Sequence, residues 1–289
     1  MASSEAPVGY VDPSFPNPNG PDDTSIIIYG YTPSIALAAL AAIWFFIHLL
    51  VHTAQTFRLR NCWWWLTFCV GLIFEVIGYI SRSLSAKKDP YNLKFFVLNY
   101  FFIVTAPVFL AAGIYTILSI LIRDTGGKRF SVVPPRLILG FFITSDVVST
   151  IVQIAGAVLV GVRESNRQDP TVANNILLGG LAYQVFAISI FIILSASFVI
   201  RARHVLKADG LTVFVAVFFF STLMVYLRTV FRLAETAEGL FGKLATHEVF
   251  FGCLEFAPIA LVALLLGIWH PGRCITYRRE AGRRQKGDA

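Results

Sequence analysis

Six ionisable side chains interrupt the longest apolar stretches of this 289-residue chain. They are three acids and three arginines, namely Glu75, Arg82, Asp146, Arg228, Arg232 and Glu255. An ionised side chain that faces lipid without a partner costs about 2.5 to 3.5 kcal/mol at the centre of a membrane helix. We therefore expect these six side chains to point into one protein interior and to compensate one another.

The spacing of the polar residues places them on stripes along helices. Four pairs lie seven positions apart: Glu75 with Arg82, Asp146 with Gln153, Arg228 with Glu235, and Glu248 with Glu255. Seven residues return nearly to the same helix face after two turns. The candidate substrate-binding residues are therefore Glu75, Arg82, Asp146, Gln153, Arg228, Arg232, Glu235 and Glu255. Asn99 and Gln184 are expected to add uncharged donors to the same interior.

The chemistry that this interior would support is recognition of an amphiphile. The three buried acids suit a cationic amine headgroup, the three arginines suit a phosphate or carboxylate, and apolar walls suit a hydrocarbon chain. The alternative is a set of structural ion pairs that fix helix packing without binding a ligand.

Long apolar helices must position these residues. Hydrophobic residues make up 56% of the chain, charged residues 14%, and the mean hydropathy is +0.69. Because soluble domains carry about a quarter charged residues, this composition excludes a soluble single-core enzyme. It predicts an all-α integral membrane protein with seven transmembrane helices, at residues 33–53, 63–84, 95–122, 137–162, 175–200, 211–233 and 249–269. Pro107 and Pro258 are expected to kink the third and seventh helices.

The distribution of basic residues predicts the orientation. Of the 24 lysines and arginines, 15 lie on the side of the first, third and fifth loops and the C-terminal segment, and six lie on the other side. The positive-inside rule then puts the N-terminus outside and the C-terminus in the cytoplasm. In this orientation Glu75 lies near mid-membrane, Asp146 in the inner half, and the other four charges in the outer half.

The chain divides into three regions on this basis. Residues 1–32 hold four acids and no lysine or arginine, and we expect a disordered extracellular tail. Residues 33–269 form the transmembrane domain, and residues 270–289 form a basic cytoplasmic tail. That tail is expected to contact anionic inner-leaflet lipids. No folded nucleic-acid-binding module accompanies the basic cluster, so we expect no nucleic-acid partner.

Histidines offer a weaker, metal-based hypothesis. His48 and His52 are one helical turn apart, and His204 and His270 also fall at predicted cytoplasmic helix ends. Two histidines at this spacing are able to share a metal ion. No adjacent acid completes a metalloprotease-type signature, so a structural or headgroup role is the preferred interpretation, and no cofactor is expected.

Several motifs together resemble one known family. They are Tyr31-Thr32-Pro33-Ser34, His48, the run from Glu75 to Arg82, Ala106-Pro107 with Tyr115, Asp146-Val147-Val148-Ser149 with Gln153 and Gly156, and Arg228 and Arg232 with Glu235. This set resembles the fungal RTA-like, or lipid-translocating exporter, family of seven-helix membrane proteins. The last helix departs from the family pattern of Glu, Tyr and Asp, because the corresponding positions here are Glu248, Gly252 and Glu255.

The resemblance implies a fungal plasma-membrane protein, not an enzyme, that exports or flips sphingoid bases or related lipids. It also implies resistance to amphiphilic toxins and, in some relatives, porphyrin or haem handling. Two other classes stay open from the residues: a seven-helix receptor-like lipid sensor and a metal-dependent membrane hydrolase.

The orientation yields the first testable prediction. A C-terminal epitope tag should resist protease added outside intact cells, whereas an N-terminal tag should be digested, because basic loops are retained in the cytoplasm. Western blotting of both tags before and after detergent lysis measures this. Digestion of the C-terminal tag in intact cells would reverse the orientation.

Overall fold

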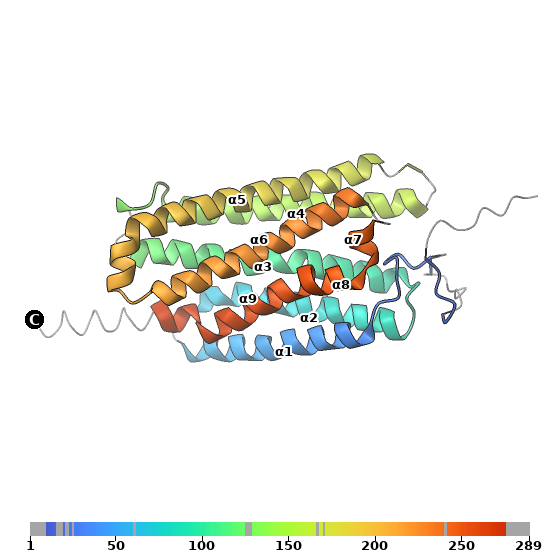
Figure 1. Ribbon diagram of the computed structural model, residues 1–289, viewed down its shortest axis with the longest axis horizontal. Coiled ribbons are helices and arrows are strands. Elements are labelled where there is room, and N and C mark those ends of the chain that lie inside the picture. Colours follow the sequence, from blue (N-terminus) through green and yellow to red (C-terminus); the bar gives the residue numbers. More distant parts are fainter. Residues whose placement is uncertain are drawn as a thin grey trace, which may run out of the picture.

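The computed structural model describes residues 10–15, 20, 23–24, 26–59, 62–124, 129–165, 168–169, 171–239 and 242–275. Long helices lie side by side in a bundle (Figure 1). The first six spans are α1 (Ile35–Arg58), η1 with α2 (Trp63–Trp65, Leu66–Lys87), α3 (Leu93–Asp124), α4 (Pro135–Ser165), α5 (Thr171–Ala208) and α6 (Thr212–Glu238). The seventh follows α7 (Lys243–Thr246) and comprises α8 (Glu248–Phe250), η3 (Phe251–Phe256) and α9 (Ala257–Ile268).

Seven helical segments are long and apolar enough to cross a membrane. This confirms the predicted all-α class and the predicted number of spans. The observed helices mostly extend a few residues beyond the predicted ones. A helix can continue into polar residues at its ends, whereas hydropathy identifies only the apolar part. The end of α5 shows this clearly: it passes through Arg201 and Arg203 to Ala208.

The helices pack in chain order and close into a ring. Each of α1 to α5 contacts the next, α6 contacts both α5 and α9, and α9 returns to α1. In Figure 1, α4 and α5 lie along one edge of the bundle and α1 and α2 along the opposite edge. A core of aromatic and branched aliphatic side chains fills the interior, with Trp65, Phe68, Phe191 and Phe218 among its members. The ring therefore sets which helices can share a site.

The outer face of the bundle is apolar, as a membrane requires. Ile43, Phe186, Ile193 and Ile200 are each more than half exposed in the isolated chain. So many exposed apolar side chains would favour aggregation in water. In a membrane they contact the lipid acyl chains, and such a surface is normal there. The chain is accordingly a multi-pass integral membrane protein.

The seventh span contains a π-helix, which the sequence analysis did not anticipate. Residues Phe251–Phe256 form it, and the N–H of Ala257 bonds to the carbonyl of Gly252, five residues back. Pro258 follows at the start of α9 and has no N–H to give to the usual partner four residues back. Widened turns of this kind occur frequently at functional sites. In contrast, α3 is continuous through Pro107.

The described residues before α1 pack onto the end of the bundle where α1 begins. Ile27 is fully buried and clusters with Tyr29 and Tyr91. Thr24 donates its backbone N–H to the carbonyl of Tyr91, and the Tyr91 hydroxyl donates to the carbonyl of Phe15. The division of the chain into an extracellular tail, a membrane domain and a basic tail stays a prediction, and residues 276–289 lie outside the described part.

Close approach of α4 to α5 requires glycine at position 156. A Cβ there would lie 2.7 Å from the backbone nitrogen of Leu177. We predict that Gly156→Ala destabilises the protein by about 1 to 3 kcal/mol, because two packed backbones must separate. The control is Gly140→Ala, since a Cβ at Gly140 would meet nothing within 4 Å. Thermal unfolding in detergent measures both, and equal unfolding temperatures for the two variants would contradict the packing argument.

Candidate functional site: two buried polar networks

Arg228 of α6 joins three helices in the membrane interior. Its guanidinium forms an ion pair with Glu255 of η3, and the same Nη2 atom donates to the carbonyl oxygen of Ile103 on α3 at 2.6 Å. Arg228 is 4% exposed and Glu255 1% exposed. The second carboxylate oxygen of Glu255 lies 4.0 Å from Nε of Arg232. Glu255 thus bridges the two arginines of α6.

Arg232 has a partner of its own on α6. Its Nη1 donates to Glu235 at 2.8 Å, and its guanidinium lies 5.2 Å from the centre of the Tyr100 ring on α3. A cation over an aromatic face gains electrostatic stabilisation, and the gain is larger where water is excluded. The α6 charges therefore form one connected network with Glu255.

Glu75 of α2 enters this network without an ion pair of its own. It is 1% exposed and interacts electrostatically with Arg228 and Glu255. Among the described residues, its Oε1 atom accepts no hydrogen bond, and no ion pair within 4.0 Å includes it. A buried carboxyl with an unpaired oxygen is costly and marks a place where a donor is missing.

Arg82 extends the network to the end of the bundle where α1 begins. Its Nη2 atom donates to the Tyr31 hydroxyl at 2.6 Å and to Glu248 of α8 at 3.1 Å. The Phe251 ring lies 4.0 Å from the Arg82 guanidinium carbon. Burial raises the pKa of Tyr31 above its usual value, although Arg82 acts in the opposite direction, so the hydroxyl is a neutral acceptor at pH 7.

Glu248 connects this arginine to the start of α1. Both of its carboxylate oxygens accept the backbone N–H of Ser34, at 2.9 and 3.1 Å, and Ser34 is the N-cap of α1. A carboxylate is favoured there because the N-terminus of a helix carries unsatisfied N–H groups and a partial positive charge. Glu235 also interacts electrostatically with Arg82, which links the two ends of the network.

A second network, made of two separate hydrogen-bonded groups, lies between α3, α4 and α5. Asp146 accepts the Tyr115 hydroxyl at 2.8 Å, while its other oxygen, Oδ1, has no hydrogen-bond partner in the described part of the chain. One turn and two turns along α4, Ser149 and Gln153 form a relay. Gln153 donates to Ser149 and to Gln184 of α5, each at 2.8 Å, and Ser149 donates to the carbonyl of Gly180.

The structure therefore brings together six of the eight candidate residues and leaves two apart. The burial of the charges is confirmed: all six ionisable residues are below one-tenth exposed except Arg232, whose side chain is 14% exposed. Asp146 and Gln153 form no hydrogen bond or ion pair with the first network among the residues described. Their helix, α4, packs against α3 and α5. Seven-residue spacing predicts that two residues share a helix face, but it does not predict which other helix that face contacts.

Sequence reasoning left four contributors out of the candidate set: Glu248, Tyr31, Tyr100 and Phe251. For Glu248 a signal existed, because it lies seven residues before Glu255. The aromatic rings carried no comparable signal, since nothing local distinguishes a ring that covers a guanidinium from a ring in the core. Asn99 is buried with its Oδ1 unpaired among the described residues, and Gln184 belongs to the second network.

His48 and His52 are engaged in hydrogen bonds within the protein. Trp65 donates to Nδ1 of His52, whose Nε2 lies 3.0 Å from the carbonyl of Ala263, so both ring nitrogens are used. His48 uses Nδ1 with the carbonyl of Trp44. Within the described ranges, no group of three histidines, cysteines or acids is placed to hold a metal ion. This geometry gives the metal hypothesis no support.

Comparison with known proteins assigns the family. A family model described as RTA1 like protein matches residues 68–278, which include all eight candidate residues. The chain belongs to the RTA1-like family. No solved structure matches it.

Three Saccharomyces cerevisiae relatives in the RTA1-like family are informative. The sphingoid long-chain base transporter RSB1 is 30% identical, and the similarity covers 84% of this chain and 73% of that protein. Protoporphyrin uptake protein 1 is 25% identical over 85% of this chain and 92% of its own length. Protein RTM1 is 28% identical over 68% of this chain and 63% of its own length. The resemblance inferred from the motifs is thus confirmed.

The Arg228 ion pair generates a stability prediction. Arg228→Met should destabilise the protein by about 3 to 5 kcal/mol, because Glu255 and Glu75 would be left with one arginine fewer. Arg228→Met combined with Glu255→Met should recover part of that loss, since two apolar groups replace a pair. Thermal unfolding of wild type, both single variants and the double variant gives the coupling energy. Simple addition of the two single effects would show that the pair does not act as a unit.

Proposed function

We propose that this protein binds and translocates sphingoid bases or related lipids across the fungal plasma membrane. The relative named as a sphingoid long-chain base transporter supports lipid transport at the level of the family. The names of the relatives, a transporter and an uptake protein, also support a role without catalysis. The first network supplies the headgroup site in this proposal.

The observation that carries the proposal is the charge balance of that network. Its acids are Glu75, Glu235, Glu248 and Glu255, and its bases are Arg82, Arg228 and Arg232. Four carboxyls against three guanidiniums leave one negative charge uncompensated when all are ionised. A buried excess charge is strongly unfavourable unless a proton or a cationic ligand neutralises it. An amine headgroup does so.

Glu75 is the residue that we assign to the amine. It has no ion-pair partner, and its unpaired Oε1 matches the missing donor that an ammonium group would provide. The arginine partners of Glu255 and Glu235 hold those carboxylates in place, while Asp146 and Gln153 offer a separate polar position deeper along α4. The predicted orientation, with the N-terminus outside and the basic tail on anionic inner-leaflet lipids, belongs to this proposal.

A second candidate substrate is a porphyrin. The relative named as a protoporphyrin uptake protein favours it, and three buried arginines suit the carboxylates of such a ligand. The two candidates make opposite demands on the network, because an amine needs Glu75 ionised whereas a carboxylate needs the arginines free.

Glu75→Gln separates the candidates. In reconstituted vesicles, we expect this variant to lower transfer of a fluorescent sphingoid base by about tenfold or more, because a hydrogen bond between charged groups contributes roughly 1.5 to 3 kcal/mol. Folding should change little, since no ion pair is lost. Transfer of the lipid between leaflets and thermal unfolding are measured on the same preparations.

Glu238→Gln is the matched control. Glu238 is the last residue of α6, is exposed, and accepts the backbone N–H of Leu244, which a glutamine oxygen also accepts. The Glu238→Gln variant should transfer the sphingoid base at the wild-type rate. Folded Glu75→Gln protein that moves the sphingoid base at the wild-type rate would make the network structural. Porphyrin binding by wild type that is lost in Arg228→Gln, without any sphingoid-base transfer, would support the porphyrin candidate instead.

A further inference from the structure

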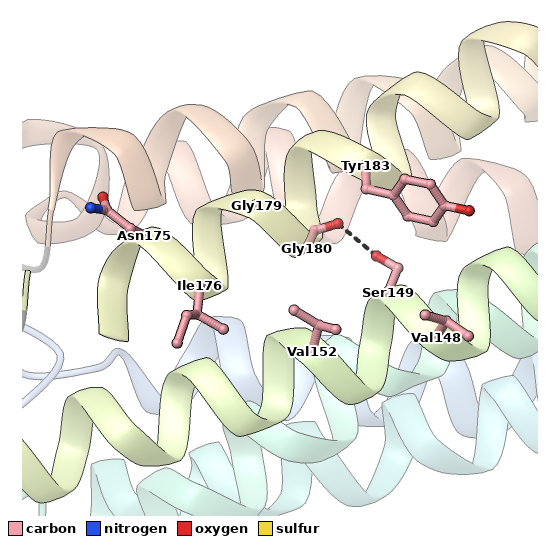
Figure 2. Close-up of a pocket in the computed structure, with 8 residues that line it drawn as sticks. All are labelled: Val148, Ser149, Val152, Asn175, Ile176, Gly179, Gly180 and Tyr183. Carbon is pink, nitrogen blue, oxygen red and sulfur yellow. Dashed lines mark hydrogen bonds between the residues drawn. The ribbon is translucent and has the colours of Figure 1, made fainter. Parts of the chain in front are cut away.

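A groove lies on the bilayer face of the bundle, between α4 and α5. Its volume is about 310 Å³, and its walls are Val148, Ser149, Val152, Asn175, Ile176, Gly179, Gly180 and Tyr183. Figure 2 shows Val148, Ser149 and Val152 on one helix facing Ile176, Gly180 and Tyr183 on the other. Val148 is 49% and Tyr183 43% exposed, so the groove opens outward and not into the bundle.

The polar side chain at the floor of the groove, Ser149, is already hydrogen-bonded within the protein. Ser149 donates its hydroxyl hydrogen to the carbonyl of Gly180 at 2.7 Å and accepts from the amide of Gln153 at 2.8 Å. Ser149 therefore has no hydroxyl hydrogen left to donate to a ligand. Contact with the floor and the valine and isoleucine walls is therefore apolar, and a hydrocarbon fits this surface whereas a polar headgroup does not.

The position along the helices matches the acyl region of one leaflet. Asn175 and Tyr183 are eight residues apart on α5, which corresponds to a length of about 12 Å at 1.5 Å per residue. Half of a bilayer's hydrocarbon core is about 15 Å thick. The groove begins close to Thr171, the first residue of α5, and so runs inward from the interface. Its long axis is therefore suited to an extended chain that lies along α5.

Glycines shape the groove in two different ways. Gly180 is needed for packing, because a Cβ there would lie 3.0 Å from Gln153 and 3.2 Å from the Ser149 carbonyl oxygen. A Cβ on Gly179 would meet nothing within 4 Å, although Gly179 lines the groove. Glycine inside a helix costs roughly 0.5 to 1 kcal/mol relative to alanine. Packing does not require glycine at 179, but an open groove does.

We propose that the groove binds a single hydrocarbon chain of a bilayer lipid, which inserts between α4 and α5 with its headgroup toward the Asn175 end. The bilayer is what covers this face, because both helices are membrane-spanning there. A volume near the lower limit of known ligand pockets admits one chain and not a whole amphiphile. This site is distinct from the charged network, and its occupation does not depend on transport.

The test is photo-crosslinking in vesicles. The full chain is reconstituted in phosphatidylcholine that contains a trace of phosphatidylcholine with a diazirine in one acyl chain, and adducts are mapped by mass spectrometry. We expect adducts on the groove residues to exceed those at Ile193 and Ile200, which are 63% and 66% exposed on the same helix. Gly179→Leu fills the groove and should reduce the groove adducts about tenfold or more, in line with the effect of an excess methylene in an apolar pocket.

Gly140→Leu is the matched control, because Gly140 is also exposed, has nothing within 4 Å of a Cβ, and does not line the groove. It should leave the groove adducts unchanged. Val148→Phe fills the groove from the opposite helix. It is the variant to use if Gly179→Leu unfolds at a lower temperature than wild type. Equal labelling of the groove and of the Ile193 region, or labelling that survives both filling variants, would overturn the proposal. So would a chemical crosslink between two copies through this face that Gly179→Leu abolishes.

Discussion

The ion pair between Arg228 and Glu255 is the interaction on which the interior depends. Neither side chain can reach water, so each must be neutralised by the other or leave the membrane interior. Arg228 also donates to the carbonyl of Ile103, and this fixes α6 against α3 as well as against the seventh span. The π-helix that holds Glu255 matters here, because an extra residue in its turn changes the direction in which later side chains point. The pair therefore constrains three spans together.

The other charged side chains of the network differ in whether they have an oppositely charged partner. Arg232 and Glu235 satisfy one another, and Arg82 is held by Tyr31 and by Glu248, which also caps α1. Glu75 alone has no oppositely charged partner within 4.0 Å among the described residues of the network. A protein that needed these charges only for packing would gain stability from an apolar residue at that position. Keeping a carboxyl there is understandable when the group must bind a cation or a proton.

The sequence predicted the seven spans because hydropathy depends on composition over about 20 residues, and each span exceeds that length. It also predicted burial, since lipid exposure of a charge is costly wherever the helix packs. The hydrogen-bond and ion-pair partners of the buried charges were not predictable in the same way. Asp146 shares the seven-residue spacing but lies on α4, which the ring order places against α3 and α5, away from the first network. Ser34 and Tyr31 reach the site from outside the membrane spans, where no periodicity exists.

The charged network and the apolar groove lie on different helices of the bundle. Charges gather where α2, α6 and the seventh span meet, whereas the open apolar groove belongs to α4 and α5. Ser149 links the groove to the second polar network, because it forms the floor of the groove and relays hydrogen bonds from Gln153 to Gly180. A chain that enters the groove would therefore press on the helix pair that holds the Asp146 network. The Gln153 to Gln184 bond crosses from α4 to α5, so the polar relay opposes separation of these helices.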